Sequence, residues 1–131
     1  EREAVLDAER PVIAGVFHNR LRDGWPMASC PTVQYALGYQ PDEESWWKRF
    51  LTFDDLEVVS TYNTYQNLGL PPGPIASPGL DAIAAAAQPA ETQLYFFMVD
   101  CAKENGSHVF AANEAEHLAN FDRCGGVITA P

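Results

Sequence analysis

"TQLYFFMVDCAKENGSHVFA", residues 92–111, contains the pattern from which the fold class can be inferred. Its first part, residues 92–99, is a run of aromatic and branched side chains of the kind enriched in strands. The turn-forming "KENG" follows, and "SHVFA" at 107–111 returns to a strand-like composition. Two short strand segments joined by a turn predict an antiparallel hairpin.

Helical patterns lie on both sides of this hairpin. Apolar residues recur at helical spacing between Asp7 and Arg22. Ser77 and Pro78, a capping residue and a proline suited to the first helical position, precede an alanine-rich run that Pro89 ends. Further predicted elements are the end of a helix at 1–5, a helical turn at 31–37, a short helix after the Thr52–Asp55 capping pair, and a helix at 114–122 capped by Asn113 and Glu116. Helices around one hairpin, without alternating βαβ units, predict a single compact α+β domain.

The composition excludes several classes of partner. With 8 basic and 18 acidic residues, the 131-residue chain carries a net charge of −10, which repels nucleic-acid phosphates and anionic lipids. No run approaches the roughly 18–20 apolar residues of a membrane span. The sequence therefore predicts neither a nucleic-acid partner nor a membrane contact for these residues.

The cysteines and histidines show no spacing typical of a metal site. Cys30, Cys101 and Cys124 lack the CxxC or Cys/His pattern that would hold zinc. Cys101 and Cys124 could form a disulfide if the domain functions outside the cytoplasm. The three histidines, His18, His108 and His117, form no sequence cluster, and residues such as His108 and His117 are more often packed or on the surface than catalytic.

Four hydrogen-bonding side chains stand in a row at 62–65, directly before a proline-rich loop. Tyr, Asn and Thr offer flat apolar faces with uncharged donors and acceptors, which suits a neutral polyol such as a sugar chain. The prolines limit the conformational entropy that is lost when a ligand orders the loop. The alternative is that Asn63 and Thr64 satisfy backbone groups of a turn, while Tyr62 and Tyr65 belong to the core.

Cleavage of a sugar chain can use a single carboxyl group that protonates the leaving oxygen. On so acidic a chain most carboxylates are solvated surface groups, and spacing alone does not choose among them. A hydrolase with two carboxylates stays possible, although no pair is marked as facing across a cleft. The candidate acids are Glu1, Glu3, Glu9, Asp54, Asp55, Glu57 and Asp81.

Four blocks of the sequence, taken together and in order, resemble the MltG family, the YceG-like endolytic murein transglycosylases. The blocks are "EREAVLDAERPVIAGVFHNRLRDGWPM", "CPTVQYALG", "YNTYQNLGLPPGPIASPGLDAIAAAAQPAETQLYFFMVD" and "HVFAANEAEH". They extend over nearly the whole chain, from Glu1 to about Phe121. The resemblance implies that residues 1–131 are the YceG-like catalytic domain, a segment of a longer chain.

The resemblance also implies an activity: cleavage of peptidoglycan strands between N-acetylmuramic acid and N-acetylglucosamine, leaving a 1,6-anhydromuramyl end. The catalytic glutamate of the family's E-K-E motif matches Glu3 of "ERE", which would act as acid and then as base, without cofactor or metal. Asn19, with Arg20, could equally fix structure through backbone contacts. The substrate-binding residues implied for a glycan groove near Glu3 are Tyr62, Asn63, Thr64, Tyr65, Gln34, Tyr35 and Asn19.

Family membership would place the protein outside the cytoplasmic membrane. The full-length parent would carry one N-terminal transmembrane anchor, a LysM-like module and a helix upstream of Glu1, and cell-wall synthases would be its possible protein partners. One position departs from the family, which commonly has Asp where this chain has Cys30. Two other functions stay open: a muramidase that admits water to the same groove, and a glycan-binding module without catalysis.

Overall fold

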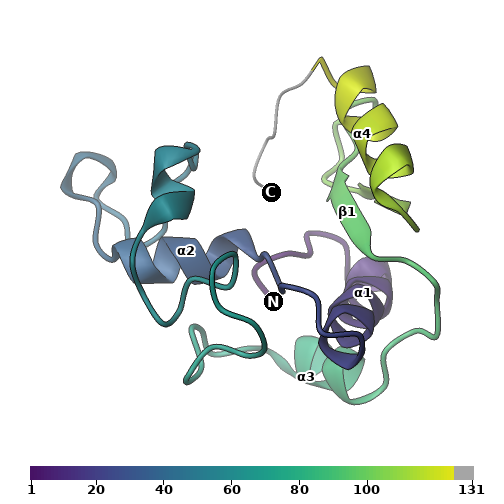
Figure 1. The fold of residues 1–131 in the computed structure, drawn as a ribbon, viewed down its shortest axis with the longest axis horizontal. Coiled ribbons are helices and arrows are strands. Elements are labelled where there is room, and N and C mark those ends of the chain that lie inside the picture. The colour runs from purple at the N-terminus through teal and green to yellow at the C-terminus, as the bar shows by residue number, and fades with distance from the viewer. Residues whose placement is uncertain (126–131) are drawn as a thin grey trace. The chain divides into compact units, whose positions relative to one another are not determined.

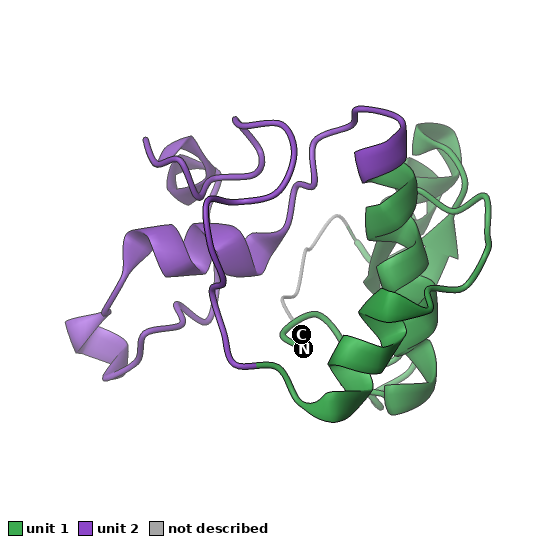
Figure 2. Ribbon diagram, turned by 90° about the horizontal axis from the view of Figure 1, so that it is seen from below, with its two compact units in different colours: residues 1–20, 78–129, 131 green, residues 21–77, 130 purple. Residues whose placement is uncertain are grey.

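The computed structural model describes residues 1–125, which form two compact units (Figure 2). Unit 1 comprises residues 1–20 and 78–125, and unit 2 comprises residues 21–77. The last six residues of the expected domain, 126–131, lie outside the described residues.

Unit 1 contains the predicted antiparallel hairpin, which together with the helices confirms the α+β class (Figure 1). Strand β1, Phe96–Val99, pairs with β2, His108–Ala111, with Phe96 opposite Ala111 and Val99 opposite His108. The pairing continues by one bond, from Tyr95 N–H to the Ala111 carbonyl at 3.0 Å. β1 is therefore shorter than the predicted run from residue 92.

The carbonyls just before β1 bond to helix α1, Arg10–Arg22, rather than to a strand. The Asn19 amide Nδ2 donates to Thr92 O at 3.0 Å and to Leu94 O at 2.9 Å. Nearby, a Cβ on Gly15 would collide with the Ala90 carbonyl, so only glycine permits this approach of α1 to the chain. These contacts explain where the strand begins.

The helix predicted from Asp7 to Arg22 is confirmed, with a tighter first turn. A 3₁₀ turn, η1 (Asp7–Glu9), leads into α1, which buries Ile13 and Val16. The helix end predicted at 1–5 is wrong, because this segment is not helical. Its side chains contact distant parts of unit 1 instead. A helix of so few residues would be only marginally stable by itself.

The two later helices of unit 1 begin differently. Helix α4, Glu114–Arg123, starts as predicted: the Asn113 side chain accepts the Glu116 N–H at 3.0 Å. Helix α3, Leu80–Ala87, has Gly79 as its N-cap, so the predicted cap at Ser77 is wrong. Within residues 1–125, no helix has the length and apolar character needed to cross a membrane.

A disulfide joins the hairpin connection to the end of α4. Cys101 and Cys124 are bonded, with their Cα atoms 5.6 Å apart. Helix α4 contacts both strands and lies beside β1 in Figure 1. The pairing left open by the sequence is therefore present, and it links the turn to the helix that packs on the sheet.

Unit 2 has few regular elements and depends on side-chain hydrogen bonds. Its helix α2, Cys30–Leu37, confirms and extends the predicted helical turn, and it buries Val33 completely. The 3₁₀ turns η2, Pro41–Glu43, and η3, Asp54–Glu57, follow. Most of the remaining chain between residues 38 and 77 is loop.

Candidate active site

The tyrosine- and asparagine-rich segment 62–65 forms a turn in unit 2, in which Asn63 is wholly buried. The Asn63 amide donates to Leu56 O at 2.8 Å and to Val58 O at 2.9 Å, and its carbonyl accepts the Tyr65 N–H at 3.0 Å. All three bonds are to backbone groups. Asn63 thus fixes the turn instead of facing a ligand, as the alternative reading of the sequence proposed.

Thr64 links this turn to the start of α2. Its side chain is 1% exposed, and its hydroxyl lies 2.8 Å from the Thr32 hydroxyl and accepts the Ser29 N–H at 3.1 Å. The Thr64 carbonyl accepts the Ala28 N–H at 3.1 Å. The structure thereby brings two blocks, 30–38 and 62–65, together, and it gives Thr64 a structural role in place of the expected direct contact.

The exposed part of this region is aromatic. Tyr35, on α2, is 42% exposed, and its ring centroid lies 4.8 Å from that of the half-buried Tyr62. A Cβ on Gly73 would lie 3.2 Å from the Tyr62 hydroxyl, so the proline-rich loop passes directly beside this ring. Tyr65 is half-buried, with its hydroxyl 3.3 Å from Cys30 Sγ. We call Tyr35 and Tyr62 the tyrosine pair.

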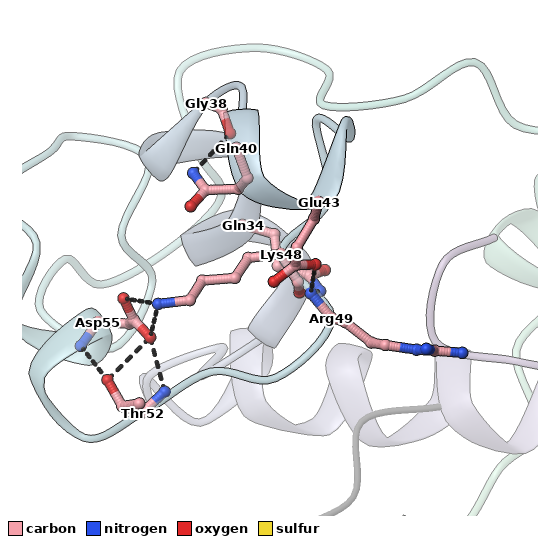
Figure 3. A network of polar contacts seen from close by, with 8 residues as sticks. All are labelled: Gln34, Gly38, Gln40, Glu43, Lys48, Arg49, Thr52 and Asp55. Carbon is pink, nitrogen blue, oxygen red and sulfur yellow. Dashed lines mark hydrogen bonds and ion pairs between the residues drawn. The ribbon is translucent and has the colours of Figure 1, made fainter.

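A polar network supports the other end of α2 (Figure 3). The buried Gln34 amide donates to Lys48 O at 2.7 Å. The Lys48 ammonium bonds both oxygens of Asp55 at 2.7 Å, and Asp55 also accepts the Thr52 N–H at 2.7 Å. Because Gln34 is used in this way, it positions the segment after α2 rather than presenting its amide to solvent.

The network also bears on the choice of a catalytic acid. Burial raises the pKa of Asp55, but the Lys48 ammonium and the Thr52 backbone and hydroxyl groups outweigh burial, so the net pKa is lowered. Asp55 is thus an anion near neutral pH and unsuited to donating a proton. Asp54, Glu57 and Asp81 are exposed carboxylates.

Two carboxylates of unit 1, Glu1 and Glu3, are those of the "ERE" segment in which the sequence resemblance predicts the acid. Glu1 Oε2 accepts the Gly79 N–H at 2.8 Å at the start of α3 and lies 3.8 Å from Arg10 Nη1. The Gly79 hydrogen bond, helped by Arg10, lowers the pKa of Glu1 although partial desolvation opposes it. Glu3 is half-buried. The lowered pKa of Glu1 disfavours Glu1 as a neutral acid.

A third carboxylate, Glu9, pairs with His108. Both Glu9 oxygens accept the His108 backbone N–H at 3.1 Å, and Oε2 lies 2.7 Å from the ring atom Nδ1. This pair could not be predicted from the sequence, because 99 positions separate the two residues and no local pattern connects them. His117, also packed, stacks on Phe96 with centroids 5.0 Å apart.

The sequence-predicted residues thus fall into two sets. Gln34, Tyr35 and residues 62–65 belong to unit 2, while Glu3 and Asn19 belong to unit 1. Asn19 is 5% exposed and uses its amide on backbone carbonyls, as the structural alternative required. Among residues 1–125, no group of three or more His, Cys, Asp or Glu side chains is arranged to hold a metal ion.

Comparison with known proteins matches this chain to one family. The model of the YceG-like family matches residues 1–123. An endolytic murein transglycosylase of Bacillus subtilis is 43% identical over 117 residues, covering 89% of this chain and 30% of that protein. A protein of the same name from Streptococcus pneumoniae strain D39 is 34% identical over 120 residues, covering 92% and 21%.

A solved structure is also similar. The crystal structure of a putative yceG-like protein from Listeria monocytogenes matches with a TM-score of 0.77 and 38% identity. The match covers 91% of this chain and 35% of that one. The chain therefore spans about a third or less of the length of these three similar proteins.

Proposed function

The chain belongs to the YceG-like family, and we propose that it is the catalytic part of an endolytic murein transglycosylase acting on peptidoglycan strands. The observation that carries this proposal is its 43% identity, over 117 residues, to the Bacillus subtilis protein of that name. Because the match covers 30% of that protein, the activity is proposed for the whole protein that contains these residues.

In the proposed reaction Glu3 acts twice. Its neutral carboxyl group protonates the glycosidic oxygen as the bond to muramyl C1 breaks, and N-acetylglucosamine leaves with a free hydroxyl. The resulting carboxylate then takes the proton of the muramyl C6 hydroxyl while that oxygen bonds to C1. Glu3 is thereby reprotonated, no water is consumed, and the product ends in a 1,6-anhydro ring.

The environment of the neighbouring glutamate supports the choice of Glu3. Glu1 is engaged by the Gly79 N–H and by Arg10, and its lowered pKa favours the anion. A general acid must carry its proton near the working pH, so the lowered pKa of Glu1 makes it the weaker candidate of the two. We therefore propose a structural role for Glu1 at the start of α3.

In unit 2, the tyrosine pair is the proposed sugar-binding surface. Its rings are partly exposed and supply flat apolar faces with hydroxyl groups at their edges. The buried residues Asn63, Thr64 and Gln34 would hold these rings in place, and Tyr65 would do so through Cys30. Direct contact with the glycan is therefore proposed for Tyr35 and Tyr62.

The substrate implies that the protein works outside the cytoplasm, and the disulfide in unit 1 supports this because such bonds persist in oxidising compartments. We include in the proposal the single N-terminal membrane anchor, the LysM-like module and the possible synthase partners implied by the family resemblance. Cell fractionation and crosslinking of the full-length protein would test these assignments.

Digestion of purified peptidoglycan strands by the full-length protein tests the activity. The wild type should release strands whose muramyl ends are lighter by one water than hydrolysed ends, as read by mass spectrometry. Glu3→Gln should lower the rate by about 10²- to 10⁴-fold, the usual contribution of a general acid–base group. Glu91→Gln, an exposed carboxylate of unit 1, is the matched control and should keep the wild-type rate.

The products separate the alternatives. Reducing ends instead of anhydro ends would assign the protein as a muramidase. Strand binding without any cleavage by wild type or Glu3→Gln would assign it as a glycan-binding module. Loss of cleavage in Glu1→Gln, with Glu3→Gln unaffected, would move the acid to Glu1.

A further inference from the structure

The segment that carries Glu3 has almost no regular structure of its own. Residues 1–6 precede the first 3₁₀ turn, and no helix or strand includes them. A general acid must lie within a few tenths of an ångström of its productive position, and misplacement by about 1 Å can cost about 10²-fold in rate. Contacts with the rest of unit 1 must therefore define the position of Glu3.

The structure provides such contacts between the hairpin and the residues that directly follow Glu3. Val5 covers Gly106, since a Cβ built on this glycine would lie 2.8 Å from Val5 Cγ1. Gly106 has φ of +74°, a conformation that favours glycine. Three residues separate Val5 from Glu9, which bonds to His108 at the first position of β2.

Glu9 and His108 are held more firmly than a surface pair. The His108 side chain is 1% exposed and that of Glu9 is 17% exposed. The carboxylate receives the backbone N–H and lies against Nδ1, while the ring packs edge-on against Phe97, with centroids 5.6 Å apart. Phe97 in turn packs against Phe17 of α1 at 5.6 Å. The histidine ring is thus fixed from two sides.

Burial also argues against direct chemistry by His108. Its second ring nitrogen, Nε2, is buried and has no hydrogen-bond partner within the described part of the chain. A ring with this exposure does not reach a sugar, so it is not a catalytic residue. A buried charged or polar pair contributes little net stability. Its better-attested role is to favour one arrangement of the chain over others.

From these contacts we propose that Glu9 and His108 are positioning residues for Glu3. Both belong to unit 1, and we name them the Glu9–His108 clamp. The clamp anchors the C-terminal end of the N-terminal segment to β2. Along the chain, the Val5–Gly106 contact lies between Glu3 and the clamp. This inference rests on the proposed function, because it gives Glu3 the catalytic role.

The test measures kcat and KM for strand cleavage by the full-length protein and by clamp variants. Glu9→Gln removes the charge and one acceptor, and His108→Phe keeps a ring but removes Nδ1. Each should lower kcat by about 10- to 100-fold and leave KM for the strand within about twofold, because the acid moves while the binding surface stays. The double variant should be no worse than the more damaged single variant.

Rescue distinguishes positioning from a general structural role. His108→Asn places an amide nitrogen where Nδ1 lies and should recover most of the wild-type kcat. Glu104→Gln, an exposed carboxylate in the hairpin connection, controls for charge. Thermal unfolding of each variant shows whether it is folded at the assay temperature, so that rates are compared between folded proteins.

The outcomes are separable from those of the proposed function. If wild-type protein forms no anhydro ends, the transglycosylase proposal fails and this inference fails with it. If the wild type is active and the folded Glu9→Gln and His108→Phe variants keep its kcat, the clamp does not position Glu3 and only this inference is overturned. Failure of His108→Asn to restore kcat would also count against it.

Discussion

At the scale of single residues, His117 should make stability depend on pH. Burial of its ring lowers the pKa of His117, and Arg20 lowers it further against a smaller opposing effect of Glu114. The unfolded chain then binds a proton that the folded protein resists, so the stabilisation is complete above the ordinary value of 6.5 and declines as pH falls below it. Urea unfolding at a series of pH values should show this decline.

The variant His117→Phe should keep the stacking on Phe96 while removing the titrating group. Its free energy of unfolding should fall less steeply than that of the wild type between about pH 6.5 and pH 5, the range in which histidines titrate. Equal slopes in His117→Phe and wild type would contradict the assignment.

Residue types led to the prediction of a sugar site at residues 62–65, but they did not predict which of these side chains are exposed. Asn63 and Thr64 share the composition of a polyol-binding surface, yet they are 0% and 1% exposed and bond the turn itself. The same chemistry that binds sugar hydroxyls also binds backbone groups. Only burial separates the two uses, and burial of loop residues depends on contacts distant in sequence.

At the scale of elements, the Lys48–Asp55 pair should stabilise the segment around η3. Asp55→Asn removes the charge that the Lys48 ammonium contacts at 2.7 Å, and the lysine side chain is 26% exposed. Loss of one partner of a largely buried, charged hydrogen bond costs about 1–3 kcal/mol. The urea midpoint, followed by tryptophan fluorescence, should fall accordingly.

The neighbouring position supplies a matched control for this change. Asp54→Asn makes the same chemical substitution at an exposed residue of η3 and should leave the midpoint nearly unchanged. Because the pKa of Asp55 is lowered, its contribution should be present above the ordinary value of 3.8 and should disappear as pH falls through the lower folded value. A midpoint in Asp55→Asn equal to that of Asp54→Asn would argue against the pair.

Capping shows which element boundaries sequence can predict. Asn113 and Glu116 are three residues apart, so the predicted cap of α4 follows from local geometry. Thr52 and Asp55 also exchange hydrogen bonds, but Phe53 is the N-cap of the 3₁₀ turn η3 that follows. The start of α3 was not predicted correctly by local geometry, although Ser77 and Pro78 fit the same capping rules. There the acceptor for Gly79 N–H is Glu1, which is 78 residues away.

At the scale of the whole molecule, the same difference between local and long-range contacts decides what the sequence could predict. The hairpin, α1 and α4 were predictable because each depends on neighbouring residues. The choice of Glu3 rests on its motif alone and stays a prediction. The Glu9–His108 clamp and the division into two units were not predictable, because both arise from contacts between residues far apart in sequence. Motif matching therefore supplied a candidate acid, while the contacts of the segment that carries it required coordinates.

The division into units leads to a final prediction. The disulfide lies wholly in unit 1, and it closes a loop with a sequence separation of 23, which the chain-entropy model equates with about 3 kcal/mol. All three tryptophans, Trp25, Trp46 and Trp47, lie in unit 2. Reduction should therefore destabilise β1, β2 and α4, measured by amide hydrogen exchange, more than it shifts the tryptophan fluorescence transition.

A Cys101→Ser, Cys124→Ser double variant makes the same comparison without reductant. Cys30, which belongs to unit 2 and is not part of a disulfide, stays in place and controls for thiol chemistry outside the bridge. If the units unfold separately, the variant should lose protection in unit 1 while the fluorescence midpoint changes little. Equal losses by both probes would mean that the two units unfold as one cooperative structure, and the stability of the disulfide-bonded hairpin would then extend to the tyrosine pair.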